Sequence, residues 1–368
     1  MNRIWNTFKT LTTIDSLSLQ ERTFCDTLTK ELQNLGVETF EDSAGKQLGG
    51  NTGNLYGFYP GALKKPPLLL SAHMDTVTPG IGKQAVVDEK GVITSAGKTI
   101  LGADDVSGIV VILETLKRLK ESGQMHRPIE LLFTVAEEVY CLGSAIADYN
   151  KITAKESYTL DLSGCIGDAA NAAPTVLNFI ITVKGKAAHA GFAPHKGIHA
   201  IKIATDAIAQ IELGEPTPGL TVNIGTIHGG LAGNIVPEQC SVTGEIRSLN
   251  HQAVLEQWEL IQTIFDTTAK KRNGHLDIQG DIKVTAYETP KNSAVVERFV
   301  RACQKIDITA NIKSTLGASD QNNFALHGIA GIVVSCSMHQ VHSTDEFARL
   351  DELEQGVALL TEIILDCP

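Results

Sequence analysis

The sequence predicts an α/β fold with a mixed sheet, interrupted by a smaller inserted α+β domain. The chain has 368 residues, which is more than one ordinary domain holds. Apolar runs alternate with amphipathic segments on both sides of residues 177–288. Within those residues the predicted order becomes β-α-β-β-α-β, the ferredoxin-like pattern. We therefore expect a larger domain made of residues 1–176 and 289–368, with residues 177–288 inserted between its two parts.

The first part of the larger domain alternates helices and strands, which predicts α/β layers with a largely parallel sheet. Asp15 and Ser16 can cap the helices at its start. In residues 108–120, apolar side chains recur at helical spacing. The elements expected here are helices at 2–13, 18–35 and 108–120 and strands at 37–41, 53–59, 66–72 and 130–136.

In the inserted domain, apolar alternation and turn residues predict four strands and two helices. We expect strands at 178–185, 220–227, 240–247 and 281–287 and helices at about 197–212 and 250–272. The sequence from Glu288 to Pro290 is typical of a linker that leaves the domain. After it we expect a helix at 293–306, a strand at 330–336 and a closing helix at 351–365.

Composition narrows the classes of protein to consider. The net charge of −11 argues against a nucleic-acid-binding surface, which would be basic. No run approaches the roughly 18 apolar residues of a membrane span, and the first residues lack the apolar core of a signal peptide. The seven cysteines form no Cys-x-x-Cys pair and fit reduced thiols. We therefore expect a cytoplasmic protein without a nucleic-acid or membrane partner.

Two adjacent acids, Glu137 and Glu138, directly follow the apolar run Leu131–Ala136. Such a run is typical of a buried strand. Removing a carboxylate from water is costly, so a charge at this place usually has a cation or a proton-transfer role. This pair therefore predicts a functional site at the end of the strand.

Further metal-ligating residue types follow other apolar segments or lie in a glycine-containing turn beside one. A single aspartate at the end of a strand is more often a turn residue or a helix cap, and a single histidine is more often an ordinary core or surface residue. Together, however, these residues favour a two-metal site. The candidate ligands are His73, Asp104, Glu138, Asp161 and His342. Asp75, two residues from His73, could orient that imidazole. Glu137 could act as general base.

Four segments resemble the co-catalytic zinc peptidases, a family that includes peptidase T, glutamate carboxypeptidase and acetylornithine deacetylase. The segments are Ser71–Val77, Leu101–Asp105, Ala136–Glu138 and Leu160–Asp161. The sequences of these segments are most similar to those of peptidase T and its homologues. The resemblance implies a zinc-peptidase catalytic domain with an inserted lid and dimerisation domain.

The same resemblance implies a role for each candidate ligand. His73 and Asp161 would bind one zinc ion, Glu138 and His342 the other, and Asp104 would bridge them. Asp75 would orient His73 and Glu137 would be the base. His342 is preferred to His339 because the segment Val341–Glu346 fits the late histidine motif of the family. Cobalt or manganese are the alternatives to zinc, because availability as well as geometry decides the metal.

In the inserted domain, three further residues match the family's motifs. The resemblance implies that His189, in Ala187–Gly191, stabilises the oxyanion and that the domain forms a homodimer contact. Asn234 and Arg247 would hold a substrate carboxylate, for which a guanidinium fork is well suited. The chain departs from the family after Glu138 and after Asp161, which leaves the substrate open.

The implied activity is hydrolysis of amide bonds in short peptides by a metal-bridging water with a glutamate base, as in a tripeptidase or aminopeptidase. A deacylase or carboxypeptidase acting on N-acyl amino acids would use the same chemistry and differ in the pocket. A metal-binding dimer without activity is a third hypothesis. Glu137 argues against it, because binding alone needs no base.

Overall fold

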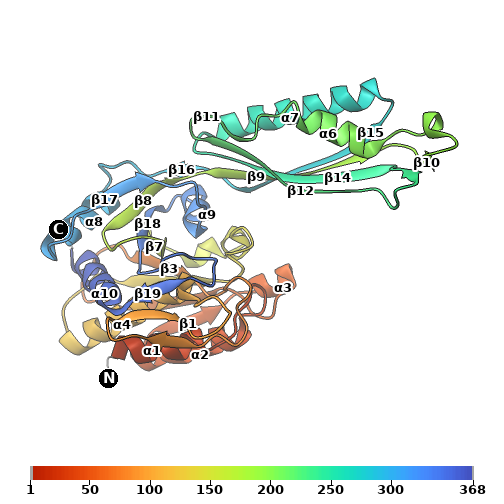
Figure 1. Ribbon diagram of the computed structural model, residues 1–368. Coiled ribbons are helices and arrows are strands. Elements are labelled where there is room, and N and C mark those ends of the chain that lie inside the picture. Colours follow the sequence, from red (N-terminus) through yellow and green to blue (C-terminus); the bar gives the residue numbers. More distant parts are fainter. Residues whose placement is uncertain (1–2, 367–368) are drawn as a thin grey trace. The chain divides into compact units, whose positions relative to one another are not determined.

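The computed structural model describes residues 3–366, which form two compact units (Figure 1). The larger unit contains the residues up to Ala172, Glu288–Thr315 and the residues from Ser319 onward. The inserted unit contains Ala173–Tyr287 and Leu316–Ala318. No helix within residues 3–366 is both long enough and apolar enough to cross a membrane.

The larger unit is built on a mixed sheet of nine strands, as the α/β prediction requires. At its centre β6, β3, β7 and β18 are parallel neighbours, whereas β1, β2 and β6 pair antiparallel. In spatial order the strands are β1 Glu38–Glu41, β2 Leu55–Tyr59, β6 Ile129–Thr134, β3 Leu68–His73, β7 Glu156–Leu162, β18 Ala330–Ser335, β8 Asp168–Ala173 and β16 Tyr287–Glu288, with β17 Asn311–Ser314 beside β8.

Helices cover this sheet, and its central strands are buried from end to end. All six residues of β3 and all six of β6 are buried, which is why their sequences are continuous apolar runs. The helices are α1 Arg3–Thr12, α2 Arg22–Leu35, α3 Ala44–Leu48, α4 Ala103–Ser122, α5 Leu142–Ala145, η1 Tyr149–Lys151, α8 Ala294–Lys305, α9 Asp320–Leu326 and α10 Leu350–Leu365. A small sheet of β4 Ala85–Val87, β5 Val92–Ser95 and β19 Phe347–Arg349 completes the unit.

The second helix begins at Arg22, not at residue 18 as the sequence predicts. Leu17 forms a β-bridge with Thr76, and Leu19 has a φ of 70°, so these residues cannot continue the helix. The chain therefore enters the helix only after passing the segment that follows β3.

The inserted unit has the ferredoxin-like order expected from the sequence, with both long helices on one face of an antiparallel sheet (Figure 1). Its strands are β9 Thr175–Lys184, β11 Gly214–Thr217, β12 Leu220–Gly229, β14 Gln239–Ser248 and β15 His275–Val284, in the order β11-β12-β14-β9-β15. Its helices are α6 Ala200–Ile208 and α7 His251–Lys271, and a turn region adds β10 Ala188–His189, η2 Pro194–Lys196 and β13 Ile235–Val236.

The last strand of this unit, β15, begins six residues earlier than predicted. Asp277, Gln279 and Asp281 alternate with apolar residues along it, and much of the strand is exposed. Its pairing with β9 over nearly its whole length, and not burial, fixes it as a strand. The first half of β15 therefore carries no continuous apolar pattern in the sequence.

Candidate metal centre

Four of the five candidate ligands lie at or after the carboxyl ends of four adjacent parallel strands. His73 is the last residue of β3, and Asp161 is the next-to-last residue of β7. Glu138 follows β6 and His342 follows β18. Since these strands are neighbours in the sheet and run in the same direction, their ends meet at one edge. Residues far apart in the sequence are thereby brought together.

Asp104 lies at the centre of this group, between two imidazoles. Its Oδ1 is 2.9 Å from Nε2 of His73, and its Oδ2 is 3.2 Å from Nε2 of His342. It is 7% exposed and sits at the start of α4, where the backbone of Asp104 and Asp105 is not helical. Each oxygen of a single carboxylate thus faces a different histidine, which is the arrangement that a bridging ligand needs.

The carboxylates of the other two acidic candidate ligands each lie near a different histidine. Oε2 of Glu138 is 2.9 Å from Nε2 of His342, and Oδ1 of Asp161 is 3.8 Å from Nε2 of His73. The remaining oxygen of Glu138, Oε1, is buried and has no hydrogen-bond partner. An unpaired carboxylate oxygen is costly unless a cation binds it. Two imidazoles with three carboxylates therefore fit a pair of divalent ions.

Hydrogen bonds to these acids raise the pKa of both imidazoles. Asp104 and Glu138 raise the pKa of His342 to about 10. Burial alone would lower the pKa of His73, but its hydrogen bonds to Asp104 and Asp75 raise it well above its ordinary value. Burial raises the pKa of Glu138 and of Asp161. A metal ion that binds either imidazole would therefore have to displace its proton.

Asp75 supports the acidic pair more directly than it supports His73. Its carboxylate accepts hydrogen bonds from the backbone N–H of Glu137, at 2.9 Å, and of Glu138, at 3.2 Å. The Ser18 hydroxyl also donates to it, at 2.6 Å. Nδ1 of His73 lies 2.9 Å from the backbone carbonyl of Asp75 and 3.5 Å from its carboxylate. The backbone carbonyl is thus the closer acceptor for the imidazole.

Glu137 is 8% exposed and lies beside the ligands. One of its oxygens, with a ring nitrogen of His73 and an oxygen of Asp161, forms a cluster whose atoms are all within 4.8 Å of one another. The Cys141 thiol donates to Oε1 of Glu137 at 3.2 Å. Burial raises the pKa of Glu137 well above its ordinary value, and the charges of Asp320 and Glu138 add to this effect.

Asp320 is a neighbour of Glu137 that sequence reasoning missed. Its side chain is 1% exposed and accepts hydrogen bonds from the Thr134 hydroxyl, at 2.5 Å, and from the Ser144 hydroxyl. These two residues flank the segment that carries Glu137. Asp320 follows no apolar strand and occupies the first turn of α9, where an aspartate is ordinary. Nothing local in the sequence distinguishes it from a helix-end charge.

His339, the less favoured of the two candidate histidines near the end of the chain, contacts residues outside the group of candidate ligands. Its Nε2 lies 2.6 Å from Oε2 of Glu352, and its ring stacks on Phe347. His342 instead lies beside the candidate ligands Asp104 and Glu138, and its backbone has a φ of 60°. A non-glycine residue in this left-handed region is strained, so its surroundings must hold it there.

The three residues expected to bind substrate lie in the inserted unit. His189 is exposed, and its Nδ1 accepts the backbone N–H groups of Gly191 and Phe192 at 3.1 and 3.2 Å. Asn234 is also exposed, and its backbone carbonyl accepts from Ala190. The Arg247 guanidinium donates to both carboxylate oxygens of Glu245 and to the carbonyl of Leu316.

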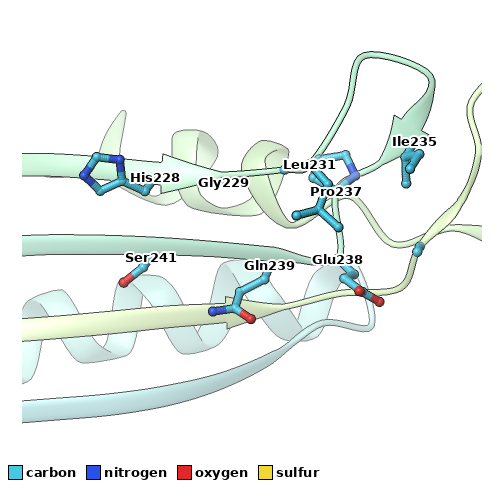
Figure 2. A pocket seen from close by; sticks show the side chains of 10 residues that line it. His228, Gly229, Leu231, Ile235, Pro237, Glu238, Gln239 and Ser241 are labelled. Atoms are coloured by element: carbon cyan, nitrogen blue, oxygen red, sulfur yellow. The ribbon is translucent and has the colours of Figure 1, made fainter.

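The segment that contains Asn234 borders a cavity of about 470 Å³ in the inserted unit. The lining residues come from the ends of β12 and β14, the turn between these strands and Ala187 (Figure 2). Leu231, at its rim, is 86% exposed.

Comparison with known proteins identifies both units. Residues 54–188 match the family model of peptidase family M28, and residues 171–273 match that of the peptidase dimerisation domain. The crystal structure of aminopeptidase PepT from Bacillus cereus is 37% identical, with a TM-score of 0.91, and the match covers 99% of this chain and 97% of that one. A tripeptidase from Staphylococcus aureus is 32% identical, with a TM-score of 0.95 and the same coverage.

A more distant structure shares the fold alone. It is a dinuclear metal-binding peptidase of the M20 family from Bacillus subtilis, 16% identical with a TM-score of 0.74, and the match covers 99% of this chain and 97% of that one. The two nearer structures match over almost their whole length at identities above 30%. The chain therefore belongs to the peptidase T-like family of M20/M28 peptidases.

Proposed function

We propose that this peptidase hydrolyses amide bonds in short peptides with the help of two zinc ions. The position of Asp104, with one carboxylate oxygen toward His73 and the other toward His342, carries this proposal. The similarity to an aminopeptidase and a tripeptidase supports the choice of short peptides as substrates.

His73 and Asp161 would hold one ion, Glu138 and His342 the other, and Asp104 both. Imidazole and carboxylate donors suit zinc, and cobalt or manganese are the alternatives. The ions would lower the pKa of a bound water toward about 7 and polarise the substrate carbonyl. The unpaired Oε1 of Glu138 supports this donor set, because it gives a cation a free ligand atom.

Glu137 would be the general base. It would take a proton from the attacking water and pass it to the leaving nitrogen of the scissile amide. Its burial and raised pKa favour this role, because a base must hold a proton between the two transfers. Asp75 and Asp320, on either side of its segment, would hold it in place.

His189 would stabilise the oxyanion of the tetrahedral intermediate. Because its Nδ1 accepts two backbone N–H groups, the proton of the neutral ring resides on Nε2. Nε2 can therefore donate a hydrogen bond outward. Arg247 and Asn234 would hold the substrate carboxylate, since the contacts of Arg247 with Glu245 and Leu316 use only three of its five N–H donors.

We further propose that residues 177–288 act as a lid and join two chains in a homodimer. In the described residues, β11 pairs with β12 only as far as Val222, so residues 223–229 leave one edge of the sheet without a partner strand. Ile227 on this segment is 45% exposed. Exposed edges invite pairing with another chain. The match to a peptidase dimerisation domain supports this partner.

A substrate panel tests the proposed function. Purified protein reconstituted with zinc would be assayed on tripeptides, dipeptides and N-acyl amino acids, with release of free amine as the readout. Cleavage of tripeptides at the amino-terminal bond is expected. Preferential cleavage of N-acyl amino acids would replace the proposal with a deacylase, and zinc binding without any cleavage would leave a metal-binding dimer.

A further inference from the structure

Glu346 is a buried carboxylate to which the reaction described above gives no role. Its residue is 1% exposed, and it lies between His342 and the strand β19. Burial raises its pKa, while backbone N–H groups counter that effect. A carboxylate this deep is costly to desolvate, so its hydrogen bonds must offset that cost.

Both oxygens of Glu346 bind the backbone of the segment that carries Asp104. Oε2 accepts the N–H of Gly102 at 2.7 Å, and Oε1 accepts the N–H of Asp104 at 3.0 Å. The two segments are more than 240 residues apart in the sequence. The segment with His342 thereby holds the segment with the bridging aspartate.

The side chain of Lys83 packs against the same backbone segment, at Gly102. Its ammonium donates to the carbonyls of Ile14 and Gly80, and its residue is 2% exposed. A Cβ atom added to Gly102 would lie 3.1 Å from its side chain, so there is little room for the backbone to move. Gly102 also has a φ of +78°, which favours glycine. The backbone before Asp104 therefore has few alternatives to its present position.

We propose that Glu346 is a positioning residue that fixes Asp104 relative to His342 and so sets the affinity for both metal ions. This inference rests on the proposed metal centre. Asp104 would contribute to both ions, so a displaced Asp104 weakens both sites together. Residues that orient metal ligands typically change metal affinity by about 10- to 100-fold when they are replaced.

The test is a zinc titration of the metal-free protein and of Glu346→Gln. The amide keeps the shape of the side chain but presents an NH₂ group to one of the two backbone donors, which breaks one contact. We expect two zinc ions to bind wild-type protein, and both to bind Glu346→Gln about 10- to 100-fold more weakly. Thermal unfolding of the metal-free proteins is measured in parallel.

Glu130→Gln is the matched control. Glu130 is also a buried carboxylate that accepts two backbone N–H groups, those of Thr153 and Ala154, at 2.9 Å each. Among residues 3–366, the hydrogen bonds described for it come from Thr153 and Ala154, neither of which is a candidate ligand. We expect Glu130→Gln to lower the unfolding midpoint and to leave zinc affinity unchanged. An equal loss of zinc affinity in both variants would overturn the positioning role.

The remaining outcomes separate this inference from the metal centre itself. Two tightly bound ions in both wild-type protein and Glu346→Gln would overturn the role of Glu346 alone. Absence of zinc binding in wild-type protein would overturn the metal centre on which the inference rests. Should Glu346→Gln fail to fold, Glu346→Asp replaces it. Its shorter side chain cannot reach both donors, so weaker binding supports the role and wild-type affinity contradicts it.

Discussion

The two units of this peptidase differ in what they bury. Within residues 3–366, no acidic, basic or histidine side chain of the inserted unit is buried, and its buried polar residues are Thr175, Ser248 and Thr268. The larger unit, in contrast, buries acidic, basic and histidine side chains. These are Glu21, His73, Asp75, Lys83, Asp104, Asp105, Glu114, His126, Arg127, Glu130, Glu137, Arg298, Asp320 and Glu346. Buried charge is costly without partners, and several of these residues, among them His73, Asp104 and Glu137, belong to the candidate site.

The contrast also separates the proposed functional residues into two kinds. In the larger unit the candidate ligands are held by fixed contacts on strand ends. In the inserted unit, His189 and Asn234 are exposed, as substrate-contacting residues of a lid would be before substrate binds. Changes at the candidate site of the larger unit should therefore affect metal binding or proton transfer, whereas changes in the inserted unit should leave the metal centre intact.

The largest effect is expected for Glu137→Gln. Without a base, kcat should fall about 10²- to 10⁴-fold, while two zinc ions remain bound, because Glu137 is not a proposed ligand. Steady-state kinetics and metal analysis of the same sample measure both quantities. Glu212→Gln, an exposed substitution in the inserted unit, is the control and should behave as wild type. Full activity of Glu137→Gln would show that another group is the base.

His189→Ala should have the next largest effect, and it tests the inserted unit. Loss of one oxyanion donor typically lowers kcat about 10²- to 10³-fold. Zinc content should stay at the wild-type value, since His189 is not a proposed ligand. His275→Ala, which removes another exposed histidine of the same unit, is the control. Unchanged kcat in His189→Ala would remove it from the mechanism, and loss of zinc would break the division between the units.

Zinc binding should depend on pH because it must displace protons. The pKa of His342 is raised to about 10, so this imidazole is protonated at neutral pH in metal-free protein. Zinc affinity should therefore rise with pH between 6 and 8, by about tenfold per unit for each proton displaced. Calorimetry in buffers of different ionisation enthalpy counts the protons released. An affinity that does not change over this range would contradict the assignment of His342.

The smallest effect concerns stability in the larger unit. Glu21 is fully buried, and burial together with the charge of Asp75 raises its pKa to about 7 from 4.5. The folded state binds this proton more tightly than the unfolded state, so the stability it contributes is complete below pH 4.5 and is lost as the pH rises toward 7. Glu21→Gln avoids this loss and keeps an acceptor for the backbone N–H of Leu19 and Ala136.

Glu21→Gln should therefore unfold at higher denaturant concentration than wild type at pH 8, with a gain of up to about 3 kcal/mol. At pH 4.5 the gain should be much smaller. Glu259→Gln, an exposed change in the inserted unit, should show little difference at either pH. A gain for Glu21→Gln that is as large at pH 4.5 as at pH 8 would show that Glu21 is not protonated in the folded state.

What the sequence could predict follows from the same contrast. Acids directly after an apolar run, such as Glu137 and Glu138, are anomalous, and this anomaly is visible in the order of the residues alone. Asp320 and Glu346 lie in polar segments where a carboxylate is unremarkable, and only the folded chain shows that they are buried. Arg247 is likewise ordinary on the less buried face of a strand, so only the family resemblance indicated it.

The fold was predictable to a similar extent. Central strands such as β3 could be predicted because they are apolar from end to end. The short strands β4, β5 and β19 could not, because three or four residues carry too little pattern. Pairing between distant segments forms them, as β19 with β5 shows. The antiparallel strands β1 and β2 at one edge were expected at 37–41 and 53–59, whereas β8, β16 and β17 at the other edge were not.

Anomalous scattering from zinc, in crystals of the reconstituted protein, would locate the ions and so decide whether the metal centre is built as proposed. We expect two ions in the larger unit, with the carboxylate of Asp104 contacting both and His73 and His342 each contacting a different one. A single ion, or ions that Asp104 does not join, would contradict the proposed centre.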